Sequence, residues 1–290
     1  MPGPFDLDDE RAYRDWREDK LGSRFERLED LLVDLQDPRQ PRPSERAALI
    51  ERCTRANMAV YRSPVTHEDK SIPRLLGLQL GLQNLERGIS SITPDGDALG
   101  EFIPYTDRAI GWHTDGYYNP QVRRIRAMTL HCVRAALEGG ESALLDHEIA
   151  YILLRDADPG HVRALSAPDA LTIPPRLEGE ALARAAERGP VFSVDKGALH
   201  MRYTARGVNI SWKDDAATRA ARAALERILA ESPYVFRLRL EAGMGIVCNN
   251  VLHARSAFRD APRHRRLLYR ARYYDRVAAK LRSLAARKAS

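Results

Sequence analysis

The sequence contains little cysteine and no long apolar run. Its three cysteines, Cys53, Cys132 and Cys248, are widely separated and form no CxxC pair, which argues against a disulfide framework and a zinc knuckle. No stretch of about 18 apolar residues is present, and the first residues, MPGPFDLDDE, lack the apolar core of a signal peptide. We therefore expect a cytoplasmic protein that does not span a membrane.

A strong charge imbalance and internal repeats are also missing. Lys and Arg number 46 against 40 Asp and Glu, a net charge of +6, and much of this excess falls between residues 259 and 288. Such an excess is typical of a solvated surface, and without a recognition motif we do not expect nucleic acid as a partner. The 290 residues, 44% hydrophobic and 30% charged, suit one globular domain.

The N-terminal region has helical patterning. Apolar residues recur at three- and four-residue spacings over 8–37, where Gly22 would divide two amphipathic helices. Ser44 is the expected cap of the next helix, and residues 93–102 have the composition of a surface loop. Further segments with helical patterning are 72–85, 147–156, 215–231 and the basic tail 277–290.

From about Ile125 the pattern changes to short apolar or alternating segments, which is typical of strands. Many short strands after a helical region predict a mixed α+β fold, mainly β, with a double-stranded β-helix (jelly-roll) core and flanking helices. We assign residues 1–290 to one domain, with a helical extension (1–56), a core (57–275) and a basic C-terminal helix or tail (276–290). The predicted strands are 57–63, 125–133, 142–146, 197–204, 208–212, 234–241, 245–254 and 266–274.

The motif GWHTDG (111–116) places an imidazole and a carboxylate two residues apart. His113 and Asp115 would point to the same side of an extended strand, although an H-x-D pair alone often arises by chance. His253, at the end of an apolar segment, adds a third donor. Two histidines and one carboxylate are the ligand set of mononuclear non-haem iron(II), which leaves coordination positions open, whereas a structural zinc site closes its sphere.

Four motifs follow one another along the chain: GWHTDG (111–116), LHCVRAALEGGESALLDH (130–147), NNVLHARSAF (249–258) and RRLLYRARYYD (265–275). In this order they resemble the taurine dioxygenase/γ-butyrobetaine hydroxylase (TauD/TfdA-like) superfamily of Fe(II)/2-oxoglutarate oxygenases. The resemblance covers roughly residues 100–275, with looser similarity over 57–90. It implies that His113, Asp115 and His253 bind iron.

The same resemblance implies a binding site for 2-oxoglutarate. Arg266, thirteen positions after His253, matches the residue that pairs with the distal carboxylate, and a guanidinium fork suits that group. Arg263, ten positions after His253, is the alternative anchor. Ser142 matches the position of a hydroxyl donor to the co-substrate, although the neighbouring glycines alone would also make a tight turn. Arg270 matches a second arginine close to both co-substrate and substrate.

Several other residues are candidates for the surroundings of the site. Asn249 and Asn250 either orient His253 or satisfy backbone groups at a turn, and we favour the first interpretation. His131 is interpreted as a scaffold histidine. The candidate substrate contacts are Tyr117, Tyr118, Asn119 and Arg270.

We therefore predict a dioxygenase that couples oxidative decarboxylation of 2-oxoglutarate, giving succinate and CO2, to hydroxylation or related C–H oxidation. The arginine cluster at 263–270 favours a small polar or anionic metabolite as substrate. A non-catalytic metal-binding jelly-roll sensor and an oxygenase acting on nucleic acid are the alternatives. A homo-oligomer is compatible with the sequence, since symmetric assembly is common.

Overall fold

The computed structural model describes residues 3–94, 105–178, 181–206 and 210–277. It divides into two compact units, each assembled from three stretches of chain. Unit 1 comprises residues 1–24, 111–124 and 145–235, and unit 2 comprises residues 25–110, 125–144 and 236–290. The assignment of one domain with a core at 57–275 stays a prediction. Most of the predicted loop 93–102 and of the basic tail lies outside the described residues.

Unit 2 contains a large sheet with the strand order β1-β2-β16-β5-β19-β3. Its first two strands are parallel, and the other pairs are antiparallel. The strands are β1 (Leu32–Asp34), β2 (Met58–Arg62), β3 (Ser90–Ile92), β5 (Ala127–Arg134), β16 (Met244–Cys248) and β19 (Leu267–Tyr273).

A second sheet has the order β15-β7-β17-β4, and β18 pairs with β6 in a short ribbon. Strand β17 carries His253 and lies beside β4, which carries His113. The strands are β4 (Ile110–His113), β6 (Glu138–Gly139), β7 (Ser142–Leu145), β15 (Phe236–Leu238), β17 (Leu252–Arg255) and β18 (Phe258–Arg259).

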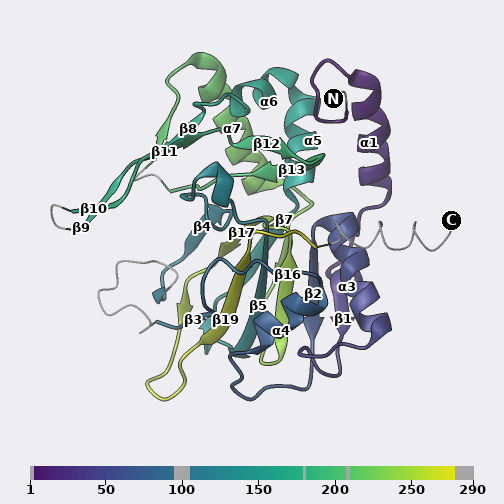
Figure 1. The fold of residues 1–290 in the computed structure, drawn as a ribbon, viewed down its shortest axis with the longest axis vertical. Coiled ribbons are helices and arrows are strands. Elements are labelled where there is room, and N and C mark those ends of the chain that lie inside the picture. The colour runs from purple at the N-terminus through teal and green to yellow at the C-terminus, as the bar shows by residue number, and fades with distance from the viewer. Residues whose placement is uncertain (1–2, 95–104, 179–180, 207–209, 278–290) are drawn as a thin grey trace. The chain divides into compact units, whose positions relative to one another are not determined.

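Side chains on the strands of the large sheet alternate between its two faces, and each face packs into its own apolar core. On β16, Val247 packs with residues of helices α3 (Pro43–Ala56) and α4 (Ile72–Gln79), which lie along this sheet in Figure 1. Ile246 and Cys248 point to the other side, where they pack with Leu144 and Leu238 of the second sheet. Two sheets stacked over a shared core, with helices outside, form the jelly-roll arrangement that the strand pattern predicts.

Unit 1 combines helices with short strands. Helices α5 and α7 begin at aspartates, Asp146 and Asp215, that accept hydrogen bonds from backbone N–H groups of the first turn. Tyr151 packs edge-on against Phe5, Trp16 and Phe192. The helices are α1 (Glu10–Gly22), α5 (His147–Ala157), α6 (Pro159–Leu165) and α7 (Ala216–Glu231). The strands are β8 (Leu171–Ile173), β9 (Arg176–Glu178), β10 (Ala181–Arg184), β11 (Glu187–Gly189), β12 (Phe192–Asp195), β13 (Ala198–Met201) and β14 (Ser211–Trp212).

Some predicted elements differ from the structure at their ends. The segment 8–37 ends in α2 (Leu28–Leu31) and β1, because Leu32–Asp34 pairs with β2. The cap of α3 is Arg42, with Pro43 as the first helical residue, so the prediction of Ser44 is wrong. Helix α4 stops at Gln79, two residues before Gly81, whose φ of 83° is left-handed.

The predicted strand 245–254 is two strands, since Asn250 has a left-handed φ of 55° between β16 and β17. The sequence patterns also missed α6 and the short strands between 171 and 195. Those strands are too brief to show clear periodicity. In the described part of the chain, no helix is long and apolar enough to cross a membrane.

Candidate active site

The segment that follows β4 positions the first two candidate ligands. His113 ends the strand, and Asp115 lies just beyond it. The intervening Thr114 is fully buried and anchors the backbone, because its N–H donates to Tyr203 O at 3.0 Å and its Oγ1 accepts from Tyr203 N at 3.1 Å. His113 also forms an isolated antiparallel β-bridge with Thr204. These bonds fix the segment that presents both side chains.

The two histidines are held in the same way. His113 Nδ1 lies 2.9 Å from the Gly111 carbonyl oxygen, and His253 Nδ1 lies 3.0 Å from the Val251 carbonyl oxygen. A carbonyl only accepts, so each Nδ1 carries the proton and each Nε2 keeps its lone pair. That tautomer suits metal ligation through Nε2, with the ring oriented by its own strand.

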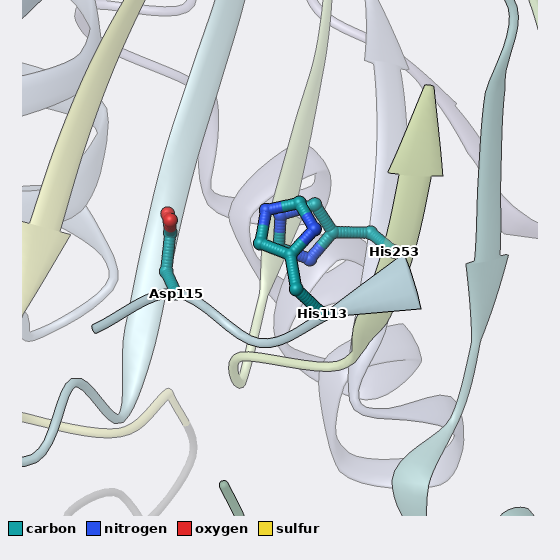
Figure 2. A group of neighbouring side chains, drawn as sticks. All are labelled: His113, Asp115 and His253. Atoms are coloured by element: carbon teal, nitrogen blue, oxygen red, sulfur yellow. The ribbon is translucent and has the colours of Figure 1, made fainter. Parts of the chain in front are cut away.

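The ligand atoms of His113, Asp115 and His253 all lie within 4.8 Å of one another. In Figure 2 the two imidazoles approach each other, and the Asp115 carboxylate rises from the same side of its segment as the His113 ring. Asp115 is buried, and the histidines are half-buried. This donor set and its access to solvent fit a non-haem iron(II) centre with open coordination positions.

A pair of buried arginines lies in unit 2. Arg255 is on β17, two residues after His253, and Arg266 immediately precedes β19; they are 7% and 6% exposed. Their guanidinium carbons lie 4.7 and 5.1 Å from the centre of the Phe258 ring. Burial and the nearby charge of Arg266 lower the pKa of Arg255 to about 9, and burial lowers the pKa of Arg266. With a pKa of about 9, Arg255 stays charged at neutral pH.

The surroundings of Arg266 contain few counter-charges. Its backbone N–H donates to Asp260 at 2.7 Å, but no carboxylate of the described residues lies within ion-pair distance of its guanidinium. Arg263, the alternative anchor, is exposed. Arg255 was missed by the sequence patterns, although its place two residues after His253 puts both side chains on one face of β17.

Ser142 and Arg270 lie on strands that face the shared core. Ser142 is buried and two residues before Leu144, while Arg270 is two residues after Leu268, and both leucines belong to the core between the sheets. A Cβ on Gly140 would lie 3.5 Å from Arg266 Nε, so the turn before Ser142 closely approaches that arginine.

The two asparagines support the fold around β16 and β17. Asn249 donates to Cys53 O and accepts from Val277 N, and Asn250 donates to Ile125 O. The role we favoured, orientation of His253, is therefore replaced for Asn249 by the satisfaction of backbone groups. His131 is buried beside Tyr61, whose hydroxyl lies 3.0 Å from its Nδ1, and burial lowers its pKa to about 4, as suits a neutral scaffold histidine.

The candidate substrate contacts separate into two groups. Tyr117 and Asn119 line a hollow that also contains Asp115. Tyr118 does not line it and instead packs against Tyr117 and Arg184.

Comparisons with known proteins place the chain in a family. The family described as "Taurine catabolism dioxygenase TauD, TfdA family" matches residues 40–272. The chain belongs to this family. Two relatives carry the name uridine-5'-phosphate dioxygenase. The one from Amycolatopsis sp is 35% identical over 70% of this chain and 80% of its own. The one from Streptomyces sp is 32% identical over 57% of this chain and 62% of its own.

Solved structures of other TauD-like enzymes share the fold. Asparagine oxygenase in complex with Fe(II), 2S,3S-3-hydroxyasparagine and succinate has a TM-score of 0.59 and 17% identity, covering 79% of this chain and 78% of its own. Non-heme iron oxygenase OrfP in complex with Fe and alpha-ketoglutaric acid has a TM-score of 0.56 and 18% identity, covering 84% of each chain.

Membership of the TauD/TfdA family confirms the predicted class of the protein. It is a dioxygenase of the Fe(II)- and 2-oxoglutarate-dependent type with a jelly-roll core. The alternative of a non-catalytic sensor is therefore set aside.

Proposed function

We propose that the protein oxidises a nucleoside 5′-monophosphate, with uridine 5′-monophosphate (UMP) as the first candidate. The observation that carries the reaction type is the cluster of His113, Asp115 and His253 within 4.8 Å. The substrate assignment is supported by the two relatives named uridine-5'-phosphate dioxygenase. Such a substrate fits the class expected from the arginine-rich sequence, a small anionic metabolite.

In this proposal His113, Asp115 and His253 hold Fe(II), each histidine through Nε2. The N–H groups on Nδ1 stay bonded to the Gly111 and Val251 carbonyls, which keeps the rings in ligating orientation. Iron with bound 2-oxoglutarate and dioxygen supplies the oxidising chemistry for a C–H bond. The protein positions the ligand atoms, provides positive charge for the anionic co-substrate and holds each histidine in the tautomer that can ligate through Nε2.

Arg266 is the proposed partner of the distal carboxylate of 2-oxoglutarate, in preference to the exposed Arg263. A buried guanidinium that lacks a carboxylate partner among the described residues is suited to an anionic ligand. Arg255 adds positive charge beside it, while Ser142 and Arg270 are proposed as further contacts. Ser142 would donate one hydroxyl hydrogen bond, so its contribution is smaller than that of Arg266.

We expect a small-molecule substrate, no nucleic acid partner and a cytoplasmic location. The three cysteines support the reducing compartment, because all are buried and none forms a disulfide. Burial raises the pKa of Cys53 and Cys132 above the ordinary thiol range, consistent with inert core thiols.

The function is tested by incubating the enzyme with Fe(II), 2-oxoglutarate and air, and measuring succinate and oxygen consumption with UMP, uridine or RNA. We expect succinate in amounts that match the UMP consumed, with His253→Ala inactive. Turnover of RNA but not of UMP would favour the nucleic-acid alternative. Turnover of neither would contradict the proposed substrate.

A further inference from the structure

A hollow in unit 1 begins at Asp115. One wall comes from residues 114–124, and the other comes from residues 190–202, which include the hairpin of β12 and β13. The side chains that matter for charge and hydrogen bonding are those of Asp115, Gln121, Arg124, Ser193, His200 and Arg202. Because Asp115 is a proposed iron ligand, a molecule in this hollow would lie next to the metal.

Arg124 is a half-buried cation in this wall. Its Nε donates to the Gln121 carbonyl oxygen at 2.8 Å, and its Nη1 donates to Ser193 Oγ at 3.1 Å. These bonds fix the plane of the guanidinium. A guanidinium fixed in this way loses little conformational freedom when an anion binds.

Arg202 stabilises this wall through hydrogen bonds to the backbone. It is 6% exposed, and its guanidinium donates to backbone carbonyls of Gly189 at 2.9 Å and of Pro190 and Glu187 at 3.3 Å. A further bond at 3.4 Å reaches the Tyr117 carbonyl. Burial lowers its pKa to about 10, so it still adds a positive charge near neutral pH.

The hollow is also shaped by a glycine. A Cβ on Gly189 would lie 3.0 Å from Gln121 Nε2 and 3.6 Å from Arg202 Nη2. The absence of a side chain there leaves room for both groups. Gln121 therefore packs over the backbone that Arg202 holds, next to Arg124.

The charge of the hollow favours an anion. Among its lining residues, Arg124 and Arg202 are cationic and Asp115 is the one carboxylate. Iron bound to Asp115 would offset that negative charge, which leaves the wall net positive. A dianionic phosphate monoester suits such a wall better than a neutral sugar or a base does.

We propose that this hollow binds the phosphate group of the substrate and that Arg124 is its main cationic contact. The inference rests on the proposed function, which supplies a nucleoside 5′-monophosphate as the substrate. Arg124 then determines specificity, since it separates UMP from uridine. Arg202 acts through the backbone of Tyr117 and Gly189 as a positioning residue.

The test measures anaerobic binding of UMP, uridine, ribose 5-phosphate or inorganic phosphate to the enzyme loaded with Fe(II) and 2-oxoglutarate. Binding is detected as a change in the visible absorbance of that complex. We compare wild type with Arg124→Gln, Arg124→Lys and the control Arg123→Gln. Arg123 is exposed and does not line the hollow, so the control removes the same charge one residue away. The affinity of each variant for 2-oxoglutarate reports whether the site is intact.

We expect Arg124→Gln to weaken UMP binding roughly 10- to 100-fold, the usual contribution of hydrogen bonds to a charged group. Arg124→Lys should recover part of this loss, and Arg123→Gln should bind UMP like wild type. Equal losses for Arg124→Gln and Arg123→Gln, or wild type that binds uridine as tightly as UMP, would overturn the assignment.

The panel also separates this inference from the proposed function. If ribose 5-phosphate binds in an Arg124-dependent way while UMP is not oxidised, the phosphate site stands and the uridine assignment fails. If UMP is oxidised equally well by wild type and Arg124→Gln, the function stands and the phosphate site is wrong.

Discussion

Two clusters of buried charge differ in how their charge is balanced. In unit 1, Lys20 Nζ lies 2.6 Å from Asp146 Oδ2 and 2.5 Å from Glu148 Oε2, and all three side chains are largely buried. In unit 2, Arg255 and Arg266 are buried beside each other with the same sign of charge. The first cluster has its counter-charges within the fold. In the second, no carboxylate of the described residues pairs with the guanidinium of Arg266, which is therefore suited to an anionic ligand.

The pKa values follow the same division. Burial alone would lower the pKa of Lys20, but the carboxylates of Asp146 and Glu148 outweigh it and raise that pKa. Burial lowers the pKa of both Arg255 and Arg266. Thus a buried cation that is paired with carboxylates of the fold stabilises the fold, while the buried Arg266 guanidinium, without a carboxylate partner among the described residues, is suited to binding a ligand anion.

The largest effect on stability is expected from Lys20→Met. The substitution leaves two buried carboxylates without their cation, so it should lower the free energy of unfolding by about 3–5 kcal/mol. The affinity for 2-oxoglutarate should not change. Denaturation and 2-oxoglutarate titration measure the two quantities.

The control is Arg17→Met, whose partly exposed pair with Asp156 should contribute about 0–1 kcal/mol. Since the pKa of Lys20 is raised, its stabilisation is complete below the ordinary lysine value of 10.5 and is lost only at higher pH. Equal losses of unfolding free energy in Lys20→Met and Arg17→Met would contradict the conclusion that the buried Lys20 cluster stabilises the fold.

Arg266→Met should weaken 2-oxoglutarate binding without lowering stability, the opposite of what we expect for Lys20→Met. Removal of the proposed carboxylate partner should weaken 2-oxoglutarate binding by about 100-fold, or about 3 kcal/mol. The melting temperature of the ligand-free protein should not fall, because the variant removes a buried charge that has no ion pair among the described residues. Anaerobic titration and thermal unfolding test both.

The matched control for this variant is Arg263→Met. Arg263 is exposed, so we expect the Arg263→Met variant to have the 2-oxoglutarate affinity and the melting temperature of wild type. A larger loss of affinity in Arg263→Met than in Arg266→Met would reverse the assignment of the anchor.

A smaller effect is expected from Ser142→Ala. The variant removes one proposed hydrogen bond from a hydroxyl, so 2-oxoglutarate affinity should fall about fivefold, or about 1 kcal/mol. Ser211→Ala, which changes an exposed hydroxyl on β14, serves as the comparison. An unchanged affinity in Ser142→Ala would leave the turn before it as a purely structural feature.

Much of the fold was predictable from the sequence, because long strands and amphipathic helices repeat with a clear period. Strands such as β5 and β19 and helices such as α7 lie close to their predicted ranges. The short strands between 171 and 195 have too few residues for a period. The division of 245–254 depends on the left-handed conformation of Asn250, which its sequence position does not reveal.

The proximity of the three candidate ligands was predictable for a different reason. The resemblance joins His113 and Asp115 to the distant His253, and the structure brings their ligand atoms together. Arg255 and Arg124 were not predictable. Their significance depends on burial, on nearby charge and on hydrogen-bond partners, which are properties of the folded chain and not of spacing along it.

The central claim is that His113, Asp115 and His253 hold the iron to which 2-oxoglutarate binds. It is tested most directly by the visible charge-transfer absorbance of the anaerobic complex of the enzyme with Fe(II) and 2-oxoglutarate. We expect this absorbance in wild type and in the control His264→Ala, and its loss in His113→Ala, Asp115→Ala and His253→Ala. Unchanged absorbance in all three ligand variants would contradict the account.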